Sequence, residues 1–488
     1  MLRILAGCLL FIFASLQSQA QNAYEITANI KPFTKGNLYL GYHFGNKQYL
    51  LDSAKINESG DAVFAGPKKL QGGVYMIIYP EKNNWVECII DQQQKFRLQS
   101  DTSNPILQLQ FEGSNDNVLF SAYQKKSMEI GKKIGQLRAA GAQVKTPAAN
   151  DSINTKIRSL NQEMLAYRNA FQKEHPAHLL SSIFNLLKDP EVPPAAKHPG
   201  GKYDSTYAYQ YYKSHYWDGI SFTDERLMRT PVMQPRFDRY FNNILPQMSD
   251  SLIVYADQVL KAAKPNEEMF KYFLSSLTDK YVNPQYMGQD AVFVHLFEKY
   301  YLTGAADAWM SEAYKKYVFD RGYSMMANVI GKRAADLPMI DTLGNKFSLY
   351  AQQGPFTVLC FWDPTCGHCQ EEVPKVDSIF QNKWKKQGVK LVGIMTDGGK
   401  DNWLKFIREH KLKDWVHIYQ TEETREKLIA SGQPGYRQLY DVYQTPILYL
   451  LDKDKNIAAK KLSFLQLDDY MEFTRRSGKK WWWKIQFS

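Results

Sequence analysis

The chain has 488 residues with 61 basic and 50 acidic side chains, a formal net charge of +11, and five cysteines. At about 100–200 residues per domain this length predicts three domains, and so few cysteines exclude a disulfide-stapled scaffold. The charges are spread along the chain, so the basic balance suits an anionic envelope surface and we expect no nucleic acid partner.

The N-terminus has the pattern of a secretory signal peptide, residues 1–20. Arg3 is followed by a mostly apolar run, residues 4–16, and by Ser18-Gln19-Ala20, a small-x-small cleavage site. That run is too short to span a bilayer. We expect cleavage after Ala20 and a mature chain in the periplasm or cell envelope. A lipoprotein anchored at Cys8 is the less favoured alternative, because only seven residues precede that cysteine. No later apolar run predicts a transmembrane span in the mature chain.

Residues 21–113 are predicted to form an all-β domain with a sandwich or barrel-like fold. Short segments with strand-like alternation follow one another, and turn signals at residues 57–61 and 71–73 separate them. Nothing in this region points to a function.

Residues 114–330 are predicted to form an all-α domain, since the apolar period changes to about 3.6 after Ser114. One stripe, expected to be core, consists of Phe270, Phe273, Leu274, Leu277 and Tyr281. The stretch 215–231 is dense in groups that could do acid–base work, but a capped helix start with ion pairs explains Asp224 and Arg226 as well. We favour that structural interpretation.

Residues 331–488 are predicted to form an α/β domain, because strand-like and helical segments alternate. A hairpin is expected around residues 343–345, a buried strand at "FTVLCFW", residues 356–362, and further strands at "KLVGIM" and "PILYLLD". The motif "FWDPTCGHCQEEVP" follows the first buried strand.

Two cysteines of this motif, Cys366 and Cys369, are predicted to be a redox pair. The strand ends in the turn Asp363-Pro364-Thr365, and a helix is expected to begin at Cys366. The unpaired N–H groups and the helix dipole there favour a thiolate, so Cys366 is the expected nucleophile. Cys369, one turn later, can resolve a mixed disulfide. His368 and Gly367 lie between them, and His368 could support the thiolate or be merely solvated.

Other chemistry fits the motif less well. A structural zinc site would need a second Cys/His pair, so we predict no metal and no cofactor besides the redox-active disulfide. Copper delivery is the alternative left open. A peroxiredoxin-type peroxidase would place a proline and a threonine well upstream of its cysteine, whereas Pro364 and Thr365 directly precede Cys366.

With these motifs in place, residues 331–488 resemble a thioredoxin-like domain, in particular the TlpA-like envelope thiol-disulfide oxidoreductases. The resemblance rests on the C-x-x-C pair at a strand-to-helix junction, on Pro374, and on Thr445-Pro446 before a later strand. It implies a cis peptide bond at Pro446 beside the cysteines and a substrate-facing Thr445. The two upstream regions resemble uncharacterised modules of Bacteroidota envelope proteins.

The sequence departs from the family at Cys360. The family buries a carboxylate six residues before the first cysteine, where it assists proton transfer, and a buried thiol cannot easily do so. Glu371, Glu372 or an acid from residues 396–444 could replace it, or Cys369 could lose its proton to water. Cys360 itself is most simply a small core residue.

The predicted function is an extracytoplasmic thiol-disulfide oxidoreductase that reduces or isomerises protein or peptide disulfides. Its expected partners are those substrates and an envelope redox partner. Acidic residues near the motif and the reductant relatives favour a reductase or isomerase, although the Gly-His dipeptide points toward a less reducing pair. The alternative is an envelope protein that binds a ligand or partner through its first two domains, with a secondary thioredoxin-like domain.

Overall fold

The computed structural model describes residues 22–142 and 146–477, and it divides into two compact units that meet in sequence between Arg239 and Tyr240. That boundary falls inside the predicted helical region 114–330, so its helices are shared between the units. The division into three domains stays a prediction. The predicted signal peptide, its cleavage site and Cys8 lie outside the described residues.

The first unit begins with a β-sandwich, as predicted. One sheet has the order β4 (Asp61–Gly66), β1 (Tyr24–Lys31), β7 (Lys95–Asp101) and β8 (Gln110–Glu112). The other has the order β3 (Lys47–Lys55), β2 (Asn37–Phe44), β5 (Gly73–Ile78) and β6 (Trp85–Ile90). Alternate residues of β1, such as Ile26, Ala28 and Ile30, are buried, because successive side chains of a strand point to opposite faces.

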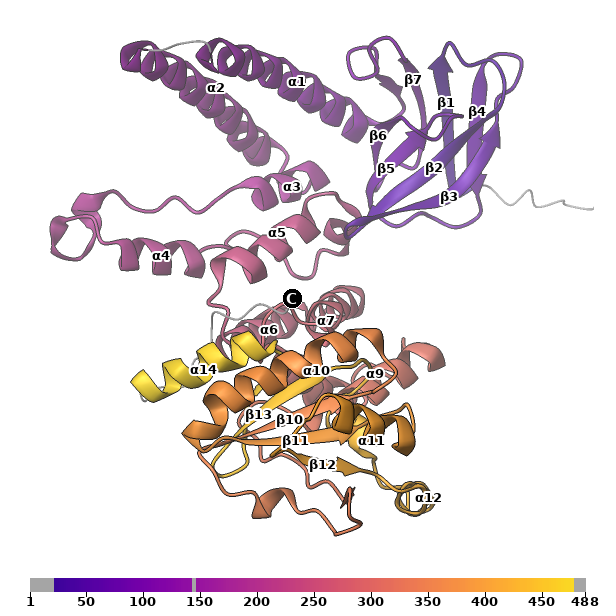
Figure 1. Ribbon diagram of the computed structural model, residues 1–488. Helices are drawn as coiled ribbons and strands as arrows, with labels where there is room; N and C mark the ends of the chain where they lie inside the picture. The colour runs from indigo at the N-terminus through magenta and orange to yellow at the C-terminus, as the bar shows by residue number, and fades with distance from the viewer. Residues whose placement is uncertain (1–21, 143–145, 478–488) are drawn as a thin grey trace, which may run out of the picture. The chain divides into compact units, whose positions relative to one another are not determined.

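Five α-helices follow in the described residues of the first unit, 22–142 and 146–239. They are α1 (Asn115–Ala142), α2 (Pro147–Glu174), α3 (Leu179–Leu187), α4 (Ser205–Ser214) and α5 (Met233–Arg239). The two long helices α1 and α2 pack side by side (Figure 1).

The charged stretch 215–231 is structural. Asp224 caps a 3₁₀ turn, Glu225–Arg229, by accepting from the backbone N–H of Arg226. The Arg226 guanidinium donates to Asp224 at 2.8 Å and to Asp91 of the β-sandwich at 2.6 Å. The ion pairs therefore join the helices to the sandwich, which agrees with the interpretation that we favour.

After a π-helical turn, Tyr240–Ile244, the second unit continues with the α-helices α6 (Ser249–Ala263), α7 (Glu267–Val282), α8 (Asp290–Leu296) and α9 (Glu312–Met326). The apolar stripe predicted in residues 270–281 lies on α7, and all five of its members are buried. That prediction is confirmed.

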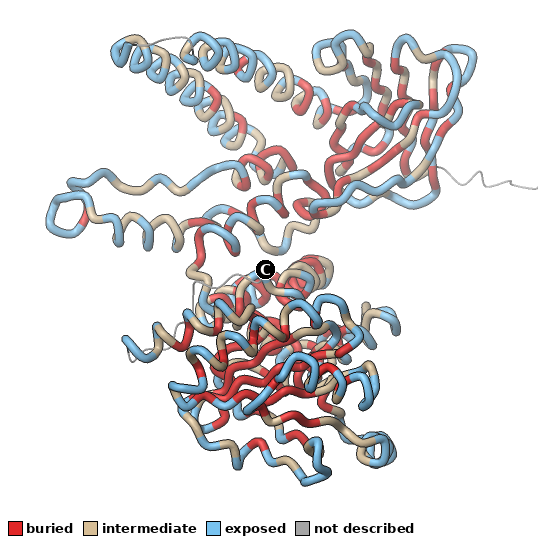
Figure 2. Tube along the Cα trace, viewed as in Figure 1, coloured by how far each residue is buried: buried red, intermediate tan, exposed pale blue. Residues whose placement is uncertain are grey.

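A six-stranded sheet forms the rest of the second unit. Its order is β14 (Ile457–Lys460), β13 (Ile447–Asp452), β10 (Phe356–Trp362), β11 (Lys390–Met395), β12 (Val416–Tyr419) and β9 (Ile340–Asp341). Strand β10 runs parallel to β11 and antiparallel to β13, and every residue of β10 is buried. The sheet is the red centre of this unit in Figure 2. The α/β prediction is confirmed.

Helices cover both faces of this sheet. Helices α10 (Gly367–Ile379), α11 (Lys400–Glu409) and α14 (Phe464–Ser477) pack on one face, and α10 and α14 lie side by side (Figure 1). The short helix α13 (Tyr436–Leu439) and the segment 334–349 pack on the other. Helix α12 (Glu422–Ala430) buries no residue. The predicted hairpin at residues 343–345 is a tight turn closed by a bridge between Ile340 and Lys346.

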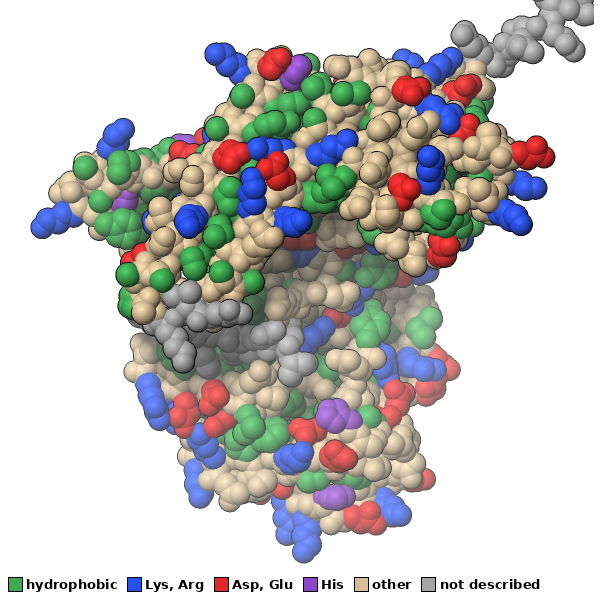
Figure 3. Space-filling view, turned by 90° about the horizontal axis from the view of Figure 1, so that it is seen from above, with side chains coloured by type: hydrophobic (Ala, Val, Ile, Leu, Met, Phe, Trp, Pro, Cys, Tyr) green, Lys and Arg blue, Asp and Glu red, His purple; other side chains and the backbone are tan. Residues whose placement is uncertain are grey.

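The surface agrees with the spread of charge in the sequence. On the face shown in Figure 3, basic and acidic side chains are interspersed. Within the two described ranges, the helices include none that is long and apolar enough to cross a bilayer.

Candidate redox-active site

The turn between β10 and α10 positions the cysteine pair. Asp363 accepts two hydrogen bonds from Thr365 through Oδ1, one from the backbone N–H and one from the hydroxyl, both at 2.7 Å. This Asx turn reverses the chain at the end of the buried strand. Cys366 then occupies the N-cap of α10, with extended dihedral angles, and Gly367 is the first helical residue. The predicted helix start is confirmed.

Cys366 is partly exposed at the helix N-terminus, where backbone N–H groups lack helical partners. The backbone N–H of Cys369 is the main cause that lowers the pKa of Cys366, and it outweighs burial, which raises this pKa. The thiol of Cys369, Thr445 and the N–H of His368 lower this pKa further. These groups all stabilise the thiolate, as expected for a nucleophilic cysteine.

Cys369 lies one turn further along α10 and is fully buried. Burial raises the pKa of Cys369 to about 11, although the backbone N–H of Asp363 donates to its sulfur at 3.5 Å. The two thiols are therefore differentiated: the surroundings of the partly exposed Cys366 favour its thiolate, and burial keeps Cys369 protonated at neutral pH.

Thr445 and Pro446 lie beside this pair. The Thr445–Pro446 peptide bond is cis, which confirms the geometry implied by the resemblance. The sulfur of Cys366 is 3.8 Å from the Thr445 carbonyl oxygen. The structure thus brings together residues that are 79 positions apart in sequence.

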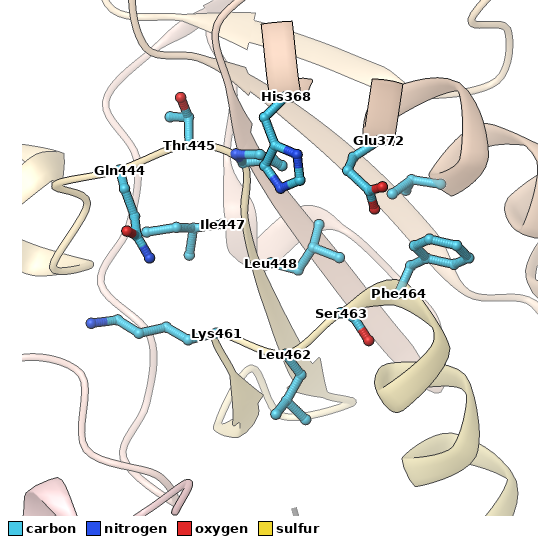
Figure 4. A pocket seen from close by; sticks show the side chains of 12 residues that line it. His368, Glu372, Gln444, Thr445, Ile447, Leu448, Lys461, Leu462, Ser463 and Phe464 are labelled. Carbon is cyan, nitrogen blue, oxygen red and sulfur yellow. The ribbon is translucent and has the colours of Figure 1, made fainter. Parts of the chain in front are cut away.

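A pocket of about 280 Å³ adjoins the cysteine pair (Figure 4). Apolar side chains form its floor, and polar groups surround them. The lining consists of His368, Glu372, Val376, Gln444, Thr445, Pro446, Ile447, Leu448, Lys461, Leu462, Ser463 and Phe464. Half of these residues are apolar and half are polar or charged, which suits a ligand that has both apolar and polar groups.

Sequence reasoning missed Gln444 and Lys461 as lining residues. Lys461 follows β14, the strand that pairs with β13 directly after Pro446. The signal that could have found it is the antiparallel pairing, because the residue after β14 returns to the end of the sheet where β13 begins. His368 is exposed and lines the same pocket.

Cys360 replaces the expected buried carboxylate, and its surroundings are apolar. It is fully buried in one cluster with Cys369, Val373 and Leu448, and burial raises the pKa of its thiol. Of the two nearby acids, Glu371 is exposed, and Glu372 accepts from Lys375 at 2.7 Å. Throughout residues 22–142 and 146–477, no carboxylate hydrogen-bonds to Cys366 or Cys369.

Comparison with protein families assigns this region. The model of the AhpC/TSA family matches residues 330–460. These residues belong to the AhpC/TSA family. Curated relatives of the AhpC/TSA-family domain are named thiol-disulfide oxidoreductase ResA. The protein from Bacillus cereus is 27% identical over 146 residues, which are 29% of this chain and 77% of the relative. The protein from Geobacillus thermodenitrificans is 24% identical over 144 residues, 28% of this chain and 75% of the relative.

Solved structures similar to the chain include proteins from Cytophaga hutchinsonii and Bacteroides caccae. A domain of a possible thiol-disulfide isomerase from Cytophaga hutchinsonii is 35% identical, with a TM-score of 0.27, and the match covers 30% of this chain and 95% of that domain. A thioredoxin-like protein from Bacteroides caccae is 22% identical, with a TM-score of 0.45, and the match covers 59% of this chain and 98% of that chain. The prediction that the AhpC/TSA-family domain belongs with the thiol-disulfide oxidoreductases is confirmed by the named relatives.

The regions before the AhpC/TSA-family domain match two families of unknown function. DUF4369 matches residues 24–120, and DUF5106 matches residues 153–328. The sequence prediction of two uncharacterised modules before a thioredoxin-like domain is therefore confirmed.

Proposed function

We propose that the protein is an extracytoplasmic thiol-disulfide oxidoreductase that reduces or isomerises protein disulfides through Cys366 and Cys369. The observation that carries the proposal is the difference between the two thiols. Cys366 is accessible at a helix N-terminus with a lowered pKa, and Cys369 is buried with a pKa of about 11. A dithiol that performs exchange needs one attacking thiolate and one resolving thiol within reach of it.

The reaction proceeds in two exchanges. The Cys366 thiolate attacks one sulfur of the substrate disulfide, so an S–S bond breaks, and the released substrate thiolate takes up a proton. Cys369 then loses its proton and attacks the Cys366 sulfur. The Cys366–Cys369 disulfide forms and the second substrate thiolate leaves. Two electrons pass to the substrate, and a reductant of the envelope must return two electrons to the pair.

Substrate binding involves the pocket beside Pro446. Thr445 and Pro446 form one wall, next to the sulfur of Cys366, and His368 forms another. Ile447, Leu448 and Phe464 give the pocket an apolar floor that suits a polypeptide chain. The twenty-residue N-terminal pattern supports the extracytoplasmic location.

Trapping of the mixed disulfide tests the proposal. A Cys369→Ala variant lacks the resolving thiol, so it should accumulate disulfides between Cys366 and substrate proteins. Cys366→Ala should accumulate none, and both variants should fail to turn over a peptide disulfide. If Cys366→Ala traps substrates instead, the roles are reversed; if neither does, the pair does not perform exchange.

The binding-protein alternative makes a different prediction in cells. If the first two regions carry the function, deletion of residues 21–330 should abolish it while Cys366→Ser leaves it intact. The proposal predicts that Cys366→Ser alone abolishes it.

A further inference from the structure

A second cavity, of about 220 Å³, lies in the second unit between helices α7 to α9 and the β13–β14 side of the sheet. Its charged lining comes from both layers. Asp290 of α8 and Arg321 of α9 face Asp441, Lys460 and Lys461. We refer to it as the Arg321–Lys461 cavity.

The cations at its opening are held in place by a buried carboxylate. Asp441 accepts hydrogen bonds from the Arg321 guanidinium and the Lys461 ammonium, and the Ser324 hydroxyl donates to it at 3.0 Å. The side chain of Asp441 is 1% exposed, whereas those of Arg321 and Lys461 are 15% and 28% exposed. Because arginine has five N–H donors and lysine three, both retain donors for a ligand, already oriented before it arrives.

The inner end of the cavity contains a buried ion pair with an unused acceptor. Lys460 donates to Asp290 Oδ2 at 2.5 Å and to Asn328 Oδ1 at 2.6 Å. Asp290 Oδ1 is buried without a hydrogen-bond partner. A buried carboxylate oxygen without a donor is costly, so this end favours an N–H group. Three cations against two carboxylates also leave the cavity with an excess positive charge.

The cavity adjoins the pocket beside the cysteines, because Gln444 and Lys461 line both. Figure 4 shows the ends of these two side chains on the same side of the pocket, opposite Glu372. Gln444 also directly precedes Thr445 and Pro446. A substrate whose disulfide reacts with Cys366 could therefore place a neighbouring part of its own chain in the cavity.

We propose that the Arg321–Lys461 cavity is a subsite of the redox site that binds an acidic side chain of the polypeptide whose disulfide reacts at Cys366. This inference rests on the proposed function. A polypeptide supplies both groups that the cavity requires, a carboxylate for Arg321 and Lys461 and an N–H for Asp290. A free inorganic anion supplies only the first and would lie near the Asp290 carboxylate.

Matched peptide disulfides test the subsite with the full-length chain. In such a series, glutamate or glutamine occupies each of the positions flanking the cysteine in turn, and kcat/KM for reduction is measured. At one or two positions, glutamate should be preferred about two- to fivefold, the range for one partly exposed charge pair. Lys461→Gln should remove most of this preference, and Lys461→Arg should preserve it. Lys427→Gln, an exposed lysine of α12, is the control and should change nothing.

The unmodified protein provides a second readout that does not depend on a variant folding. The kcat/KM for the preferred glutamate peptides should decrease as ionic strength rises, whereas the kcat/KM for the glutamine peptides should not. Equal rates for all peptides, or a glutamate preference that survives both high salt and Lys461→Gln, would overturn the subsite and leave the proposed function intact. If no peptide is reduced at all, the proposed function fails first.

Discussion

Cys366 and Cys369 are only three residues apart, yet their surroundings give their thiols opposite acidities. The first caps α10 and is partly exposed, and backbone N–H groups lower its pKa. The second is buried in the core, and burial raises its pKa to about 11. Helix position predicted the first effect from sequence. The second could be predicted only in part, since spacing shows that Cys369 lies one turn on but not how deeply its sulfur is buried.

Selective alkylation measures this difference. In a variant that starts at Gln21 and so lacks Cys8, iodoacetamide at about pH 6 should label Cys366 well before the other thiols, because only a thiolate reacts. Cys369, Cys360 and Cys88 are buried and should react only after denaturation. Peptide mapping by mass spectrometry identifies the labelled residue. Preferential labelling of Cys369 in the native protein would contradict the assignment.

A second buried titratable residue, His417, lies on β12, two strands away from Cys360. Gly393 of β11 lies between them, paired with Cys360 on one side and with His417 on the other. A Cβ atom at Gly393 would lie 3.0 Å from His417 Nδ1, so the missing side chain leaves room for the imidazole. Burial lowers the pKa of His417 to about 4, against a hydrogen bond to the Leu412 carbonyl that raises it.

His417 should therefore make the fold sensitive to acid. Its folded pKa of about 4 is below the usual value of about 6.5, so the unfolded chain binds the proton more tightly between these values. The contribution of neutral His417 to the free energy of unfolding is fully present above about pH 6.5. It is lost as the pH falls toward 4, and the loss amounts to up to about 3 kcal/mol. Urea unfolding of His417→Gln should show a weaker decline of stability over this range than the unmodified protein.

The matched control is His410→Gln, which changes an exposed histidine at the end of α11. It should retain the pH dependence of the unmodified protein. An unchanged slope in His417→Gln would mean that another group causes the acid sensitivity.

At the scale of elements, apolar patterns in the sequence predicted the strands and helices whose residues are buried continuously or at a regular period. The fully buried strand β10 and the 3.6-residue stripe of α7 both appear as predicted. The β9 hairpin is only a two-residue strand and an isolated bridge, because its turn residues are exposed and few apolar side chains hold it. Local turn signals indicate where the chain reverses but not how far strands pair beyond the turn.

Helix α9 packs closely against the segment after α8. Helix propensity alone would wrongly predict that alanine at position 322 of α9 stabilises the fold. At Gly322 in α9, a Cβ atom would come within 2.5 Å of the Phe297 ring. That ring is fully buried, and Phe319 and Tyr323 lie against it with centroids 5.3 and 5.4 Å away. The ring has little freedom to move away.

Gly322→Ala should therefore destabilise the fold, although alanine is the better helix former. Overpacking costs about 1–3 kcal/mol, which exceeds the gain of about 1 kcal/mol in helix propensity. Gly135→Ala in α1, an exposed position with no atom near the new Cβ, should stabilise by up to about 1 kcal/mol. Chemical denaturation of both variants measures the difference. A stabilising Gly322→Ala would show that Phe297 can move at little cost.

At the scale of the whole molecule, pairs that are distant in sequence decide how the helices are grouped. The pair of Lys460 and Asp290 is 170 positions apart and buried, with exposures of 2% and 5%. Separating α8 from the sheet would leave both charges without their partner, which is strongly unfavourable. This pair therefore helps to hold α8 against the sheet within the second unit. No local pattern around Asp290 or Lys460 predicts that pairing.

The same distant contacts determine the charge near the cysteines. Residues 361–374 contain no lysine or arginine, and the sequence therefore predicts only moderate stabilisation of a thiolate. The structure adds Lys461 to the adjoining pocket, but its ammonium is bound to the Asp441 carboxylate. The helix N-terminus remains the main stabilising group at Cys366, so the expectation of a reductase or isomerase is retained as a proposal.

The equilibrium of the Cys366–Cys369 pair with glutathione tests this account most directly. A strong oxidant owes its potential to heavy stabilisation of the reduced thiolate, with a value of about −120 mV, whereas isomerases and reductants are at about −180 mV or below. The full-length protein is equilibrated in glutathione buffers of known potential, and its thiols are trapped with acid and an alkylating reagent. We predict that the pair is mostly oxidised in a buffer at about −120 mV and becomes reduced only near −180 mV or below. A pair that is mostly reduced at about −120 mV would be a strong oxidant and would contradict the account.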